Sequence, residues 1–107
     1  MILEILKSYQ QEECSVESVI ERYIHFIMDE DSNYKSIIHL SQISLQKAKE
    51  LDHNFKNTRK LKGRLHGIPV VIKANIYTND DLPTSCGSLI LKDFYPNRNA
   101  NIVDWLI

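Results

Sequence analysis

The run of β-branched residues at positions 70–72 limits what this chain can fold into more than any other feature. It has no polar side chain at alternate positions, which is typical of a strand that is covered on both faces. Gly67 and Pro69 mark a turn before the run, and Lys73 ends it. We therefore predict a buried β-strand from Val70 to Lys73.

Lys73 stands at the rim of this predicted strand, directly after its apolar residues. An amine at the edge of a low-dielectric pocket loses hydration, which favours its neutral form and lets it act as a base near neutral pH. Most lysines at strand ends instead extend their amine into solvent. The residue pattern alone therefore leaves Lys73 as either a general base or a solvated side chain.

The spacing of apolar residues predicts three helices before the strand, at about residues 2–9, 16–28 and 44–54. Ser15 is the expected N-cap of the second helix, which should end at the turn-forming residues 29–33. The third helix should turn its apolar side chains inward, namely Leu45, Ala48, Leu51 and Phe55.

The chain after the predicted strand begins with a polar stretch at residues 75–88, which predicts a surface or pocket-lining loop. Asn99 is the expected N-cap of a last helix at 100–107. Ile37-Ile38 is a candidate short strand. The order of helix, strand, loop and helix predicts an α/β fold in which helices cover a sheet. The other strands must come from sequence outside these residues or from another chain.

Length and composition suit one small globular domain, since 43% of the 107 residues are hydrophobic and 25% are charged. The formal net charge of -1 argues against nucleic-acid binding as the main role. Residues 56–64 carry five cations and no acid, which predicts either a solvated loop or a docking patch for an anionic partner.

The cysteines and the N-terminus indicate a location inside the cell. Cys14 and Cys86 are far apart, which favours free thiols in a reducing compartment. The N-terminus has no basic targeting region, and Glu4 and Lys7 interrupt its apolar residues. No apolar stretch approaches the roughly 20 residues that a membrane span needs. We expect a cytoplasmic protein that does not bind membranes.

A longer motif surrounds the predicted strand. Residues 65–73 read Leu-His-Gly-Ile-Pro-Val-Val-Ile-Lys, and Asn-Ile, Pro-Thr-Ser and Gly-Ser follow at 75–76, 83–85 and 87–88. This pattern resembles the N-terminal part of the amidase signature family. The resemblance implies an incomplete α/β domain of N-terminal helices and the first part of a mixed sheet. Its expected parts are a helical segment at about 1–55, a basic loop at 56–64, a strand and pocket loop at 65–99, and the start of a helix at 100–107.

Enzymes of that family hydrolyse carboxamide C–N bonds with a Ser–cis-Ser–Lys triad and no cofactor. The resemblance places Lys73 at the triad lysine, and it makes Thr84, Ser85, Gly87 and Ser88 candidates for binding a small amide substrate. The three hydroxyls have an alternative role, in hydrogen bonds that stabilise the loop. Both triad serines lie further along the chain in the family, so we expect these 107 residues alone to be inactive.

The sequence departs from the family pattern at two positions. Arg64 stands where the family usually has proline, and Ala74 stands where it has aspartate directly after the lysine. The second departure removes a carboxylate from beside the predicted base.

Three other functions remain open at this point. One is the amidase subunit of a glutamine-dependent tRNA amidotransferase. Another is a non-catalytic module that binds a partner chain, or a second copy of itself, through an open sheet edge. The third is a nucleophilic pair of Cys86 and His66, although a small buried thiol and a histidine that braces the loop through hydrogen bonds fit the local sequence better.

Overall fold

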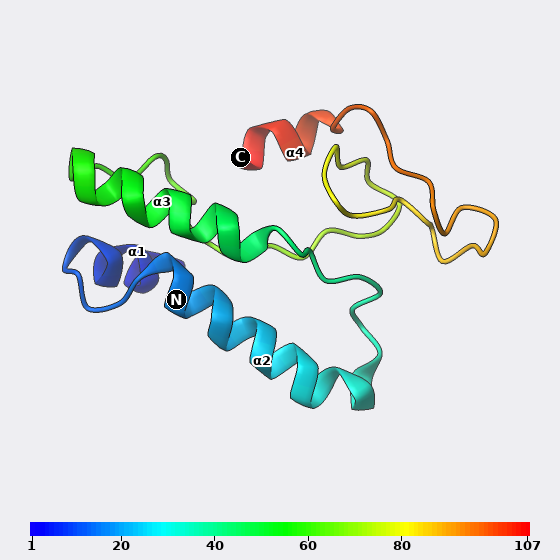
Figure 1. The fold of residues 1–107 in the computed structure, drawn as a ribbon, viewed down its shortest axis with the longest axis horizontal. Coiled ribbons are helices and arrows are strands. Elements are labelled where there is room, and N and C mark those ends of the chain that lie inside the picture. The colour runs from blue at the N-terminus through cyan, green and yellow to red at the C-terminus, as the bar shows by residue number, and fades with distance from the viewer.

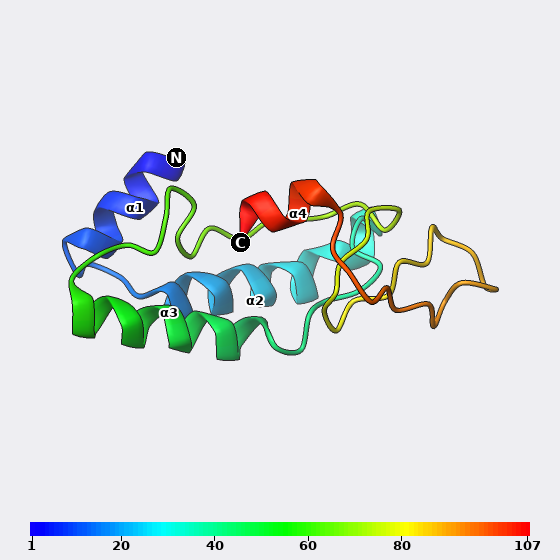
Figure 2. The same cartoon turned by 90° about the horizontal axis from the view of Figure 1, so that it is seen from above.

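The computed structural model describes all 107 residues and contains four helices joined by loops (Figure 1). The helices are α1 (Ile2–Gln10), α2 (Val16–Tyr34), α3 (Ser44–Thr58) and α4 (Asn101–Leu106). α2 and α3 lie side by side and run in opposite directions, and the coil that follows α3 returns along α2 towards α4 (Figure 2). None of the four helices combines the length and the apolar character that crossing a membrane requires.

The core lies among α1, α2 and α3, which we call the three-helix unit. It consists of the buried residues Leu6, Tyr9, Val16, Val19 and Ala48. These residues occupy the apolar stripes that predicted the helices, so helix-period spacing in the sequence becomes one shared apolar interior. The three predicted helices are confirmed.

α2 begins after Ser15, as predicted, with a reciprocal pair of hydrogen bonds. The Ser15 hydroxyl accepts from the Ser18 N–H at 3.1 Å, and the Ser18 hydroxyl accepts from the Ser15 N–H at 3.2 Å. Asp52 of α3 adds a second cap, since its carboxylate accepts from the N–H groups of Val16 (2.8 Å) and Glu17 (2.9 Å). These bonds satisfy N–H groups that a helix N-terminus leaves unpaired, and they tie α3 to α2.

Both long helices extend beyond their predicted ends. α2 continues through the polar residues 29–33 to Tyr34, and α3 continues past its predicted end to Thr58. A residue in the left-handed conformation follows each last turn, Lys35 with φ 51° and Arg59 with φ 54°. These two residues end the helices. The basic loop is therefore shorter than predicted, and its Arg59 forms an ion pair with Glu12.

The strand predicted from Val70 to Lys73 does not form, and neither does the short strand at Ile37-Ile38. No backbone N–H of residues 70–73 donates a hydrogen bond to another backbone group. A strand exists only as part of a hydrogen-bonded ladder, and these residues have no neighbouring strand with which to build one. Val71 is 74% exposed, although we predicted that both faces of the run would be buried. The chain is thus helical, and the predicted α/β sheet is absent from it.

The last helix is present, but its N-cap differs from the prediction. Ala100 occupies the N-cap position of α4, and no side chain caps it. The Asn99 amide instead accepts from the backbone N–H of Asn79 at 2.6 Å and donates to the Asp104 carboxylate at 2.8 Å. Asn99 therefore joins α4 to the loop that follows Lys73.

Candidate active site

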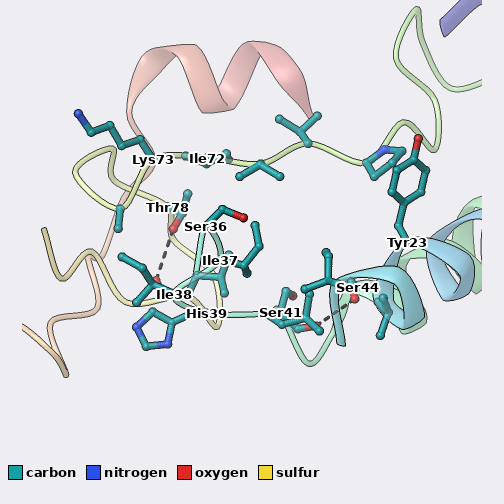
Figure 3. Close-up of a pocket in the computed structure, with 18 of the residues that line it drawn as sticks. Tyr23, Ser36, Ile37, Ile38, His39, Ser41, Ser44, Ile72, Lys73 and Thr78 are labelled. Atoms are coloured by element: carbon teal, nitrogen blue, oxygen red, sulfur yellow. Dashed lines mark hydrogen bonds between the residues drawn. The ribbon is translucent and has the colours of Figure 1, made fainter. Parts of the chain in front are cut away.

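An apolar groove lies between α2, the loop at residues 36–41 and residues 69–73, which we call the Lys73 segment (Figure 3). Its volume is about 660 Å³, and 13 of its 21 lining residues are hydrophobic. The wall from α2 is the part of its apolar stripe that extends beyond the core, namely Ile20, Tyr23, Ile24 and Ile27. Ile72 faces Ile37 and Ile38 across the groove. A groove of this kind can hold an apolar segment or the apolar part of a ligand.

Lys73 lies at one end of this groove, and its side chain points away from the groove into solvent (Figure 3). The lysines at positions 47, 49 and 92 form ion pairs within the chain, whereas Lys73 forms none. The low-dielectric surroundings that we predicted for this amine are therefore not provided by these residues. The amine is exposed and available to a further group.

Gly67 anchors the approach to the Lys73 segment. The Tyr9 hydroxyl donates a hydrogen bond of 3.0 Å to the Gly67 carbonyl oxygen. Gly67 has φ +66°, and a Cβ atom there would lie 2.6 and 2.7 Å from the two terminal methyl carbons of Val16. A side chain would therefore strain the backbone and collide with the core of the three-helix unit. This glycine lets the chain pass against the helices before it reaches Lys73.

His66 braces the same approach, as predicted. Its ring is buried between Tyr9 and Phe55, with centroid separations of 6.1 and 6.3 Å. Its Nδ1 atom accepts a hydrogen bond of 3.0 Å from the backbone N–H of Lys62. This bond closes a turn at residues 62–66.

Cys86 does not form a catalytic pair with His66. The backbone N–H of Cys86 donates to the Ala74 carbonyl oxygen at 2.9 Å, whereas His66 packs against α1 and α3. The prediction of a buried thiol at Cys86 is wrong, because Cys86 (φ 52°) and Gly87 (φ 71°) form a left-handed turn whose thiol is exposed. Cys14 is also a free thiol.

The residues that we predicted to bind substrate follow Lys73 on the loop at 84–88. Thr84 and Ser85 are buried, and the bond from Cys86 to Ala74 holds this loop next to the Lys73 segment. The Thr84 hydroxyl donates to the Ile76 carbonyl oxygen, and the Ser85 hydroxyl accepts from the Gly87 N–H, both at 3.4 Å.

The Ser88 hydroxyl accepts from the Ile90 N–H at 3.3 Å. Each of the three hydroxyls in the loop therefore has a hydrogen bond within the chain. Substrate contact by Thr84, Ser85, Gly87 and Ser88 stays a prediction.

Asp81 is a structural residue near the groove that sequence reasoning did not identify. Its carboxylate accepts from the Ser41 hydroxyl at 2.8 Å and from the N–H groups of Gln42 and Ile43, just before α3. Partial burial opposes ionisation of Asp81, but these hydrogen bonds outweigh it and hold the pKa of its carboxyl below the usual range. The neighbouring Asp80 forms an ion pair of 2.5 Å with Lys47.

The position of Asp81 between two polar residues and Leu-Pro indicates a turn, but it does not indicate the partners of Asp81 at residues 41–43. The carboxylates, histidines and cysteines of the chain do not form any group of three that could hold a metal ion.

Known proteins match nearly the whole chain. The sequence profile of the Amidase family matches residues 18–107. A glutamyl-tRNA(Gln) amidotransferase subunit from Alkaliphilus metalliredigens is 38% identical over 103 residues, which cover 95% of this chain and 21% of that protein. A putative amidase of Arthroderma benhamiae is 34% identical over 94 residues, which cover 88% of this chain and 16% of that protein.

Solved structures agree with these relatives. The peptide amidase from Stenotrophomonas maltophilia superposes with a TM-score of 0.90 at 30% sequence identity, and the match covers 98% of this chain and 22% of that chain. The complex of the peptide amidase PAM with the inhibitor chymostatin gives a TM-score of 0.91 with the same identity and coverage. The chain spans about a fifth of the length of the curated relatives that it matches. By sequence profile, sequence identity and fold, it belongs to the amidase signature family.

Proposed function

We propose that this chain is the part of an amidase that supplies the lysine base for hydrolysis of a carboxamide C–N bond, and that Lys73 is this base. The superposition on a peptide amidase over 98% of the chain carries the proposal, together with the Amidase family profile, whose match at residues 18–107 includes the Lys73 segment. The free amine of Lys73 also supports it. A general base must not be held in an ion pair that keeps it charged.

The chemistry follows from the demands of acyl transfer. A serine hydroxyl becomes a nucleophile at neutral pH only when a base accepts its proton, and in this scheme a bridging serine passes that proton to the Lys73 amine. The serine oxygen attacks the amide carbonyl carbon, and the C–N bond breaks as the leaving amine takes up a proton. Water then hydrolyses the acyl-enzyme. Both serines would come from sequence beyond the Lys73 segment.

The groove supports the proposal that further sequence completes the active site around Lys73. Its apolar walls and the unpaired backbone N–H groups of residues 70–73 are suited to a neighbouring strand or helix. Such a cover would remove water from around the Lys73 amine and favour the neutral form that a base needs. The curated relatives are about five times as long as this chain and have sequence that could supply it.

A chimera tests the role of Lys73. Residues 1–107 would replace the matching segment of the Stenotrophomonas maltophilia peptide amidase, and release of ammonia from a peptide amide would be measured. We expect Lys73→Ala to lower kcat/KM by about a thousandfold or more. The matched control is Lys92→Ala, which removes an exposed lysine paired only with its neighbour Asp93 and should change the rate by less than about twofold. Full turnover by the Lys73→Ala chimera would exclude Lys73 from the mechanism.

A second candidate is the amidase subunit of a tRNA amidotransferase. The observation in its favour is the 38% and 35% identity to two proteins that are named as subunits of a glutamyl-tRNA(Gln) amidotransferase. A parallel chimera on the Alkaliphilus protein, assayed for ammonia release from glutamine, distinguishes the two substrates. The function is that of the chimera whose activity, on a peptide amide or on glutamine, is restored more fully.

A third candidate is a non-catalytic binding module. The backbone N–H groups of residues 70–73 have no backbone partner, which favours it, because an extended segment of this kind can pair with a strand of another chain. Limited proteolysis tests this option. We expect rapid cleavage after residue 68 and a resistant three-helix unit, as in an incomplete domain. Resistance of the whole chain would favour the module.

A further inference from the structure

His66 is the one buried histidine of this chain, since His25, His39 and His53 are all exposed. Its position in the turn at residues 62–66, which we call the latch turn, fixes its protonation state. The backbone N–H of Lys62 can only donate, so the Nδ1 atom that it meets at 3.0 Å must carry a lone pair. The imidazole is therefore neutral, with its proton on Nε2.

The second ring nitrogen makes this state sensitive to protons. Nε2 is buried and has no hydrogen-bond partner among the protein groups. Protonation would place a hydrogen on Nδ1, which could then no longer accept from Lys62. It would also leave a buried, charged Nε2–H group without an acceptor, and buried charges are unfavourable unless they are paired. Proton uptake thus removes the bond that closes the latch turn.

Ionisable groups from α1, α3 and the adjoining turns face His66. A small cavity of about 260 Å³ beside the ring brings most of these groups together, namely Tyr9, Glu12, Cys14, Asp52 and Lys56. Burial lowers the pKa of His66 below its ordinary value; the Asp52 carboxylate opposes this and the Lys62 amine adds to it. Both oxygens of Asp52 are already engaged with the N-terminus of α2, which limits its ability to stabilise a charged ring.

The latch turn leads directly to the anchor at Gly67. The His66 N–H donates to the Gly63 carbonyl oxygen at 3.3 Å, and the Ile68 N–H donates to the Leu65 carbonyl oxygen at 3.0 Å. The next residues form the Lys73 segment, in which no backbone N–H of residues 70–73 donates to another backbone group. The start of that segment is therefore positioned by the latch turn and by the bond from Tyr9 to Gly67, while the bond from Cys86 to Ala74 holds the chain just after it.

We propose that His66 is a pH-sensitive latch: the neutral imidazole holds the Lys73 segment against the three-helix unit, and proton uptake opens the latch turn and releases the segment while the helices stay folded. This device is independent of whether Lys73 acts as a base.

Nuclear magnetic resonance on the dilute, isotope-labelled 107-residue chain tests the latch. The imidazole ¹⁵N shifts should show His66 with its proton on Nε2, and His66 should titrate below its ordinary pKa of 6.5. Over the same titration, hydrogen-exchange protection of the Lys62 and Ile68 amides should fall at least about tenfold more than that of α2. A His66 midpoint at or above its ordinary pKa of 6.5, or unchanged protection of Lys62 through the titration, would overturn the proposal.

Two variants separate a latch from a merely structural histidine. His66→Asn keeps a side-chain acceptor near the position of Nδ1 but cannot titrate, so its latch turn should stay protected to the same degree at about pH 7.5 and about pH 5. The control, His53→Asn, changes an exposed histidine of α3 and should keep the wild-type pH profile. A wild-type profile in His66→Asn would contradict the latch. If that variant does not fold, the titration of the unaltered chain decides.

Discussion

The three-helix unit and the region after residue 68 are stabilised in opposite ways. The first buries apolar side chains from all three helices in one cluster. The second buries polar side chains, among them Thr78, Thr84 and Ser85, and leaves large apolar ones outside. Val71, Ile90 and Trp105 are 74%, 94% and 84% exposed. The comparison teaches that a shared apolar cluster organises the first region, with helix caps in support, whereas the second leaves large apolar side chains without a covering neighbour.

The largest effect should come from a substitution at Gly67, where the chain after residue 68 is held against the three-helix unit. Gly67→Ala places a Cβ atom against Val16 at a residue with positive φ. We expect it to lower the free energy of unfolding by about 2 to 4 kcal/mol, through backbone strain and overpacking together. Urea unfolding followed by circular dichroism measures the change.

Gly63→Ala is the matched control for this substitution. A Cβ atom there meets nothing within 4 Å, so the change should cost less than about 0.5 kcal/mol. Equal costs at Gly63 and Gly67 would show that the contact with Val16 is unimportant.

A smaller effect should distinguish two carboxylates that bond to distant backbone N–H groups, Asp52 at the start of α2 and Asp81 just before α3. Asp52→Ala removes acceptors from the start of α2, within the three-helix unit, and should cost about 1 to 2 kcal/mol in urea unfolding. Asp81→Ala removes a link between the two regions, so it should cost less in unfolding but accelerate proteolysis after residue 68. The control Asp29→Ala alters an exposed residue of α2 and should be nearly neutral. The contrast fails if Asp81→Ala destabilises the helices as much as Asp52→Ala does.

The smallest expected effect concerns the hydroxyl of Tyr9. Tyr9→Phe removes its hydrogen bond to Gly67 and should cost about 1 kcal/mol at neutral pH. Burial, with contributions from Cys14 and Asp52, raises the pKa of Tyr9 to about 12 from an ordinary value of 10.0. The folded state therefore holds this proton more tightly than the unfolded state, and the associated stability is present below about pH 10 and is lost as the pH rises from about 10 to about 12.

The free energy of unfolding, measured between about pH 8 and about pH 12, checks this predicted loss of stability. The wild type should lose stability at alkaline pH more steeply than Tyr9→Phe, whereas Tyr34→Phe, at a residue that is 74% exposed, should follow the wild type. Parallel alkaline profiles for wild type and Tyr9→Phe would contradict the role of this hydroxyl.

The helices could be predicted because their information is local. The apolar stripe of α2 and the N-cap Ser15 lie within one stretch of sequence, and the structure confirms both. The family could be predicted because its motif around Lys73 is contiguous. His66 bracing the loop is also confirmed, since its partner Lys62 is four residues away.

The remaining features depend on partners that are distant in the sequence. The hydrogen bonds of Asp52 and Asp81 join residues more than 30 positions apart, which no local pattern reveals. The strand at Val70 to Lys73 was predicted from its composition, but a strand also needs a neighbour, and this chain provides none. The exposure of Cys86 depends on left-handed backbone at a non-glycine residue, which is uncommon.

Hydrogen exchange at the Lys73 segment tests the central claim, that sequence outside these residues completes the site. The amides of residues 70–73 would be followed in the isolated chain and in the chimera with the Stenotrophomonas peptide amidase. We predict exchange near the rate of an unstructured peptide in the isolated chain, and slowing by about a hundredfold or more in the chimera, where the rest of the amidase can pair with the segment. Equally fast exchange in both proteins would contradict completion of the Lys73 segment.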